Sequence, residues 1–271
     1  MRIGYYQFRP LFGKVEKNRR KVEQALQQVK ADLLVLPELA FTGYHFRDKE
    51  ELLSMAEDPA DSPTLRMLKQ LCRNGNFHIV SGFAEKQGDE VFNSALLVGP
   101  GGLVHTYRKI QLFAREKEMF TPGNIPLQVQ QVKNAKIGMM VCFDWIFPEV
   151  TRTLALLGAE VICHPSNLVL SYCQQAMLTR CLENHLFAIT CNRFGADKRP
   201  HGILRFTGQS QVVAPKGELL HRSPSQKEEL FITTIKPESA REKNITEQNH
   251  LFSDRRPEYY SPLCKAAGSK K

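Results

Sequence analysis

The sequence predicts an α/β fold in which mixed β-sheet structure is layered with helices. Apolar strand-like runs alternate with amphipathic helical patterns, as in βαβ units, and other strands follow one another through short turns, as in hairpins. Of the 271 residues, 42% are hydrophobic and 24% charged, so the chain can bury a sizeable core. The pattern favours two sheets packed face to face with helices outside. Spacing alone does not separate this arrangement from a doubly wound single sheet.

The first half of the chain alternates between strands and helices. Residues 17–30 are expected to form a helix because their apolar side chains recur at i, i+3, i+4 and i+7. Ser62 and Pro63 are typical of an N-cap and a first helical turn, so a second helix is expected to begin there. Apolar or alternating runs predict the strands, at 2–8, 31–39, 77–85, 92–100 and 103–110.

The second half continues the alternation and then turns to hairpins. A helix is expected at 148–158, where Gly158 provides the stop, and another near 174–185. Strands are expected at 135–143, 159–167, 187–195, 208–215, 218–222 and 229–235. No repeat, linker or composition break interrupts residues 1–262, which predicts a single domain. The basic residues 263–271 are expected to form a disordered tail.

The charge pattern argues against nucleic-acid binding. The net charge is +9, from 37 basic and 28 acidic residues, but the basic residues are scattered along the chain. A nucleic-acid-binding protein needs a concentrated basic face interleaved with aromatic residues. The small clusters at 14–21 and 265–271 are interpreted as a solvated helix face and a frayed tail.

The sequence also predicts a cytoplasmic protein without a membrane or metal partner. No uncharged apolar stretch of about 18 residues is present, and the N-terminus lacks the pattern of a signal peptide. The seven cysteines lie mostly in apolar runs, which is typical of buried free thiols in a reducing compartment. Because no CxxC pair occurs, no zinc site is expected.

Three polar residues each follow an apolar strand-like run. Glu38 follows LLVLP, Lys109 follows LVHTYR, and Cys142 follows IGMMV. Strand ends are where layered α/β folds build their sites. If the three ends converge, Lys109 can stabilise a carboxylate and a thiolate, and Glu38 can take the thiol proton. This arrangement would activate Cys142 without a histidine.

Each of these residues also has an ordinary structural interpretation. A cysteine at a strand end is usually a small core residue, Pro-Glu often begins a turn, and a lysine after Tyr-Arg is often a surface charge. Their joint occurrence at three strand ends favours the catalytic interpretation. The adjacent pair Cys163-His164 is not expected to act as nucleophile and base, because neighbours in a strand point to opposite faces.

The segments around these residues resemble the signatures of the nitrilase, or carbon–nitrogen hydrolase, superfamily. The three main segments are LPELAFTGY, YRKIQLF and VCFDWIFPE, and their order and wide spacing also match. The resemblance runs from about residue 2 to about residue 260. It is supported by FTPG, GAEVICHPSNL, RCLENHLFAITCNRFG, GQSQVVAPKGE and a final DRRPEYY. Nitrilase-like aliphatic amidases and nitrilases are the most similar group.

The resemblance implies a four-layer αββα sandwich of two mixed sheets with outer helices, and a Glu-Lys-Cys triad. Glu38 would be the general base, Lys109 the cationic stabiliser and Cys142 the nucleophile. A second glutamate would position the substrate, for which Glu116 is preferred over Glu118. No metal or organic cofactor is implied, and a homodimer or higher homo-oligomer is expected. Candidate substrate-binding residues are Tyr44, Phe143, Trp145 and Asn167.

The expected substrate is a small-molecule amide or nitrile. Some relatives carry a polar residue after the nucleophile segment's Asp or Trp, whereas Trp145 is here followed by Ile146 and Phe147. An apolar wall cannot pair a substrate carboxylate, so small aliphatic amides are favoured. The alternatives are a nitrilase, an N-carbamoyl- or ω-amidase acting on a carboxylated substrate, and, more remotely, a non-catalytic binding member of the fold.

Overall fold

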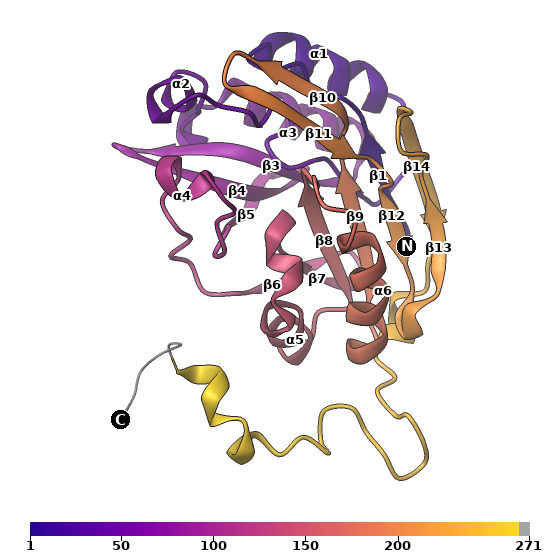
Figure 1. Cartoon of the computed structure of the whole chain (residues 1–271). Helices are drawn as coiled ribbons and strands as arrows, with labels where there is room; N and C mark the ends of the chain where they lie inside the picture. Colours follow the sequence, from indigo (N-terminus) through magenta and orange to yellow (C-terminus); the bar gives the residue numbers. More distant parts are fainter. Residues whose placement is uncertain (266–271) are drawn as a thin grey trace.

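Two six-stranded mixed sheets pack face to face in the computed structural model, which describes residues 1–265 (Figure 1). The first has the order β14-β1-β2-β3-β4-β5, with bounds Glu229–Thr234, Arg2–Gln7, Leu33–Val35, His78–Gln87, Glu90–Gly99 and Gly102–Arg108. The second has the order β13-β12-β9-β8-β7-β6, with bounds Leu219–Arg222, Gln211–Val213, Phe187–Asn192, Val161–Ser166, Ala135–Met139 and Val129–Val132. A separate hairpin joins β10 (Phe194–Arg199) to β11 (Gly202–Thr207).

The two sheets share one topology. In each, three parallel strands lie in sequence order, β1-β2-β3 in the first sheet and β7-β8-β9 in the second. An antiparallel strand flanks each trio on one side, and two antiparallel strands extend it on the other. Strands β2 and β5 run in the same direction within the first sheet, so the residues that follow them lie at the same end of that sheet.

Helices cover the outer face of each sheet, which completes four layers. Helices α1 (Val15–Leu26) and α3 (Pro63–Gly75) pack on the first sheet through side chains such as Val22 and Leu68. Helices α5 (Pro148–Leu156) and α6 (Cys173–Asn184) pack on the second sheet through side chains such as Leu154 and Met177. The largest apolar cluster includes Ile3, Val35 and Ile137 between the sheets and continues through Ile162 to Leu154 of α5. Two short helices, α2 (Lys49–Leu53) and α4 (Glu116–Met119), lie near the site.

The predicted four-layer sandwich of two sheets is confirmed, and the single-sheet alternative is wrong. The helix from Pro63 begins where predicted, because the Ser62 side chain accepts a hydrogen bond from the Leu65 N–H. Several boundaries differ. The strands predicted at 31–39 and 135–143 end early, at Val35 and Met139, because the chain leaves the sheet there to form the site. The strand predicted at 187–195 divides into β9 and β10. Helix α1 runs from Val15 to Leu26 rather than over 17–30, and α2, α4, β6 and β11 were not predicted.

The C-terminal segment leaves the layered body on the side of α5 and α6 (Figure 1). Tyr259 and Leu263 within it are exposed by 66% and 63%. The predicted tail, 263–271, is exposed over 263–265, and 266–271 lie outside the described residues. Within the described part of the chain, no helix is long and apolar enough to cross a membrane.

Candidate active site

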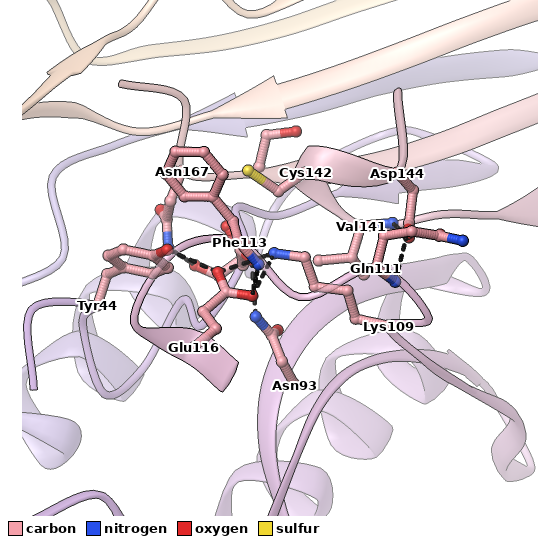
Figure 2. A network of polar contacts seen from close by, with 12 residues as sticks. Tyr44, Asn93, Lys109, Gln111, Phe113, Glu116, Val141, Cys142, Asp144 and Asn167 are labelled. Carbon is pink, nitrogen blue, oxygen red and sulfur yellow. Dashed lines mark hydrogen bonds and ion pairs between the residues drawn. The ribbon is translucent and has the colours of Figure 1, made fainter. Parts of the chain in front are cut away.

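The three strand-end residues predicted to converge lie together at one end of the sandwich. Glu38 lies in the turn after β2, Lys109 directly follows β5, and Cys142 lies in the turn after β7. Lys109 Nζ is 2.7 Å from Glu38 Oε1, and both side chains are fully buried. Figure 2 shows the Cys142 sulfur beside the lysine ammonium, with Tyr44 and Glu116 entering from the side opposite Asp144.

The Glu38 carboxylate is held through only one of its oxygens. Oε1 accepts hydrogen bonds from Lys109 Nζ and Asn93 Nδ2, each at 2.7 Å. Oε2 is buried and has no protein partner among residues 1–265. The turn that carries the residue is tight, because a Cβ at Gly82 of β3 would lie 2.3 Å from Glu38 Cα. Leu39 adopts φ +46°, a conformation that costs a non-glycine residue about 1–2 kcal/mol. The free Oε2 is thus a positioned proton acceptor.

Lys109 is fixed from its backbone as well as its side chain. Its N–H donates to the Asn93 carbonyl at 2.8 Å, and its carbonyl accepts from the Gly123 N–H at 2.8 Å. A Cβ at Gly123 would lie 2.1 Å from the Arg108 carbonyl oxygen, so only glycine allows this approach. Asn93 therefore holds Lys109 by its backbone and Glu38 by its side chain.

Glu116, and not Glu118, joins the cluster. Lys109 Nζ lies 2.9 Å from each Glu116 oxygen. Oε1 also accepts from the Tyr44 hydroxyl at 2.6 Å, and Oε2 from the Phe113 N–H at 3.1 Å. A carboxylate has about four lone-pair sites, so these donors occupy Glu116 fully. Glu118 lies on the surface and pairs with Arg115.

Cys142 lies in a strained turn. A 3₁₀ turn, Cys142–Ile146, begins at the cysteine, whose φ is +44°. Asp144 fixes this turn: its Oδ2 accepts from the Val141 N–H at 2.8 Å and the Tyr107 hydroxyl at 2.7 Å. Its Oδ1 accepts from the Gln111 N–H at 3.2 Å. One carboxylate therefore ties the cysteine turn to the loop that follows Lys109. Non-glycine residues in such conformations persist only where the surroundings hold them.

His164 supports the same turn from β8. Its Nε2 lies 2.9 Å from the Cys142 carbonyl oxygen and its Nδ1 lies 3.1 Å from Thr190 Oγ1. Because a carbonyl only accepts, Nε2 carries the proton and Nδ1 accepts from the threonine. Burial lowers the pKa of His164 to about 4, which leaves the ring neutral at pH 7. His164 thus contacts the cysteine backbone and not its thiol, as expected for a residue that is not the base.

The electrostatics of the cluster fix which groups carry protons. Burial and the Glu38 charge raise the pKa of the Cys142 thiol well above its usual range, although Lys109 opposes them. Burial alone would lower the pKa of Lys109, but Glu116 and Glu38 outweigh it and hold that pKa well above the ordinary value. Burial raises the pKa of Glu38, with Lys109 opposing and Glu116 adding to the shift. At neutral pH the site therefore contains a protonated thiol beside a permanent cation.

The candidate substrate-binding residues fall into two groups. Tyr44 and Asn167 belong to the cluster: Asn167 Nδ2 donates to the Glu38 carbonyl at 2.9 Å, and its backbone N–H contacts the Cys142 sulfur. Phe143 lies at the mouth, with its ring centroid 5.0 Å from that of Phe113. Trp145 is buried in the largest apolar cluster.

The expected apolar wall after Trp145 is only partly present. Ile146 is 42% exposed, because successive residues of the 3₁₀ turn point in different directions. Phe147 packs against Phe143, with ring centroids 5.6 Å apart. Ile146 therefore does not belong to the predicted apolar wall. Arg180 and Glu183 pair with each other at 3.0 Å, and Arg180 Nε donates to the Trp145 carbonyl, so this arginine ties α6 to the cysteine turn.

Five residues that position the cluster were not identified from the sequence. Asn93 and Asp144 accept or donate hydrogen bonds that hold the reacting residues and their turns. His164 was considered only as a base, although it supports the cysteine turn. Gly82 and Gly123 allow close backbone contacts. Gly123 lies in the FTPG segment and could have been noticed there. Nothing in the sequence around Gly82 or Asn93 indicated which residues they would contact. No cluster of residues suited to hold a metal ion occurs within the described range 1–265.

The chain is similar over nearly its whole length to known proteins. The carbon-nitrogen hydrolase family model matches residues 2–244. A nitrilase from Pyrococcus abyssi is 41% identical over 263 residues, which cover 96% of this chain and 99% of the relative. An (R)-stereoselective amidase from Pseudomonas sp. is 36% identical over 70% of this chain and 68% of its own length. The crystal structure of a carbon-nitrogen hydrolase from Helicobacter pylori G27 matches with a TM-score of 0.87 at 25% identity, covering 98% of both chains.

Proposed function

Since this chain belongs to the carbon–nitrogen hydrolase family and is therefore a hydrolase, we propose that it is an amidase for small neutral amides. The products are a carboxylic acid and ammonia, and Cys142, Lys109 and Glu38 carry the reaction. The observation that supports this best is the state of Glu38: Oε1 is anchored by two donors, while Oε2 is buried and has no partner within residues 1–265. A base with one free oxygen can take a proton without losing its position.

Acylation begins from the neutral thiol. As the Cys142 sulfur bonds to the amide carbon, its proton passes to Glu38 Oε2 and the carbonyl electrons move to oxygen. Lys109, which stays protonated, and the Phe143 N–H in the first turn of the 3₁₀ segment stabilise this oxyanion. The C–N bond then breaks, Glu38 returns the proton to nitrogen, and ammonia leaves a thioester.

Deacylation repeats these steps with water. Glu38 Oε2 takes a proton from water, the hydroxyl oxygen bonds to the thioester carbon, and the C–S bond breaks. Glu38 then returns the proton to the sulfur. The carboxylic acid is released and the neutral thiol is restored.

Glu116 is assigned a positioning role within this scheme. The sequence suggested that a second glutamate contacts the substrate, but the lone pairs of Glu116 are occupied by Lys109, Tyr44 and the Phe113 N–H. We propose that Glu116 aims Lys109 at the oxyanion. In this arrangement the amide nitrogen of the substrate contacts Glu38 Oε2 and not Glu116.

The test is ammonia release across matched aliphatic amides, N-carbamoyl compounds and nitriles. We expect the neutral amides to give the highest kcat/KM. Cys142→Ala should abolish release with the fold intact by circular dichroism, whereas Cys163→Ala should retain it. Activity in Cys142→Ala, or its loss only in Cys163→Ala, would show that the nucleophile is assigned wrongly.

Nitrile hydrolysis is the second candidate, because the 41% identical relative is named a nitrilase. The same thiol can attack a nitrile carbon, and two waters then yield acid and ammonia. A kcat/KM for nitriles at least tenfold above that for the matched amides would favour this candidate over the amidase.

We also propose that the chain forms at least a homodimer through α5, α6 and the C-terminal segment. Exposed apolar side chains occur in or next to these elements, namely Leu156, Leu157, Tyr172, Leu182 and Leu263. Large apolar patches on one face are typical of an interface. Light scattering at micromolar concentration should give at least twice the 30.9 kDa chain mass. A monomer mass would contradict the proposal.

A further inference from the structure

An apolar cavity lies against the Tyr44–Glu116 side of the cluster. Its volume is about 120 Å³, and six apolar side chains line most of it, namely Phe46, Phe113, Met119, Phe120, Val169 and Leu204. They come from four separate parts of the chain: the loop after the Glu38 turn, the loop and short helix after Lys109, the segment after β8, and strand β11.

The inner end of the cavity reaches the catalytic cluster. Tyr44 and Glu116 line it, and Tyr44 donates to Glu116 while Glu116 holds Lys109. Phe113 also lines it and packs against Phe143, the residue after the candidate nucleophile. Cys142 does not itself line the cavity, so a group on the carbon that it attacks would enter past Tyr44, Glu116 and Phe113.

The polar groups on the wall do not favour an anionic occupant. Arg115 lines the cavity, but its Nε donates to Glu118 and its guanidinium to the Arg47 carbonyl. Burial lowers the pKa of His45, so its ring is neutral at pH 7. The remaining charge on the wall is the Glu116 carboxylate, which repels another anion. The arginine on this wall is thus already engaged with the Glu118 carboxylate and a backbone carbonyl.

We infer that this cavity receives the acyl side chain of the substrate and selects short, branched, uncharged groups. The inference rests on the proposed amidase function. A cavity of about 150 Å³ lined by apolar residues can hold benzene, so a cavity of 120 Å³ suits a group of about four carbons, such as isobutyl. A carboxylate in place of the branch would be buried without a partner.

The β10–β11 hairpin forms part of the cavity wall, and substitutions there can test the inference. Leu204 lines the cavity, whereas its strand neighbour Ile203 is 54% exposed. Adjacent residues in a strand face opposite sides, so the two positions form a matched pair. Val169, which is half-buried on the opposite segment, provides an independent site for the same change.

The first experiment compares kcat/KM for acetamide, 3-methylbutanamide and malonamate. Each buried methylene is worth about fourfold, so three additional carbons predict roughly a fiftyfold preference for 3-methylbutanamide over acetamide. Leu204→Phe and Val169→Phe should each reduce that preference below about fivefold, because the added ring occupies the space of the branch. Ile203→Phe should leave the preference unchanged.

The second experiment does not depend on turnover. In the Glu38→Gln protein, each amide is tested for protection of the Cys142 thiol from iodoacetamide. 3-Methylbutanamide should protect at concentrations at least tenfold lower than acetamide or malonamate, and Leu204→Phe should remove that advantage.

Equal protection by acetamide and 3-methylbutanamide, or better protection by malonamate, overturns the inference about the cavity. So does a loss of turnover in Leu204→Phe that is the same for every amide. Failure of the wild type to release ammonia from any amide overturns the amidase function instead. In that case the protection experiment alone decides what the cavity accepts.

Discussion

Asp144 provides a quantitative test of how the site is held, because one carboxylate accepts three hydrogen bonds, two of them buried and one partly buried. Its Oδ2 takes two donors and its Oδ1 takes one. Asp144→Ala removes all three acceptors and leaves buried N–H and O–H groups unpaired. At about 1–3 kcal/mol for each unsatisfied group, we expect a loss of about 4 kcal/mol of unfolding free energy. This is a large part of the roughly 5–15 kcal/mol that a domain has.

Asp144→Asn is the matched control. Its amide oxygen can occupy the Oδ2 position and keep two donors, while its NH₂ faces the Gln111 N–H. One unpaired donor predicts a loss of about 1–2 kcal/mol. Urea unfolding followed by circular dichroism measures both values. If Asp144→Ala cost no more than Asp144→Asn, the three-bond anchoring of the cysteine turn would be wrong.

The same pair of proteins tests the ionisation of Asp144. Burial is the largest influence and raises the pKa of this carboxyl to about 6, above the value near 3.9 of an unfolded chain. The folded state therefore binds more protons between about pH 4 and pH 6, and this contribution to stability is lost as pH rises through that window. The stability margin of the wild type over Asp144→Asn should narrow from pH 4 to pH 6. A margin that is constant or widens over this range would contradict the assignment.

Two further predictions concern positioning. Gly82→Ala places a Cβ 2.3 Å from Glu38 Cα, and a displacement of this kind should lower kcat/KM by about a hundredfold; Gly101→Ala, where the added Cβ meets nothing within 4 Å, should be neutral. Equal activities of the two variants would refute the tight turn. Glu116→Gln replaces the carboxylate that holds the Lys109 ammonium with a neutral amide, and kcat/KM should fall about a hundredfold. The Cys142 thiol should still be alkylated in this variant. Glu118→Gln, a change to a surface residue, should leave activity within twofold, and the same loss in both variants would remove the distinction between the two glutamates.

The sequence predicted the parts of the fold that depend on local pattern. The Ser62-Pro63 cap and the Gly158 stop located the helices that begin at Pro63 and Pro148, and the strand runs were long enough to indicate layered sheets. Periodicity failed where the chain leaves a sheet to build the site. The apolar run through Cys142 continues beyond β7 because the turn itself is buried, so hydrophobicity could not mark where the strand ends.

The reacting residues were found because each follows a strand-like run, but their supports were not. Asn93 lies 55 positions from the carboxylate it holds, and Asp144 bonds three donors spread over 35 positions of the chain, from 107 to 141. Such contacts depend on how the sheets pack, which no local pattern encodes. The neutral state of the thiol was likewise hidden, because burial and two nearby carboxylates determine it together.

The central claim is that Glu38 deprotonates a neutral Cys142 thiol during attack. It is tested most directly by the pH dependence of Cys142 alkylation in wild type and Glu38→Gln. The exposed Cys264 is replaced by serine in both proteins, and the modified residue is located by peptide mass. Glu38 raises the pKa of Cys142, so its neutralisation should move the alkylation curve to lower pH. Amide turnover should fall at least a thousandfold in the same protein, because the general base is gone. A curve that moves to higher pH, or turnover that survives, would contradict the mechanism.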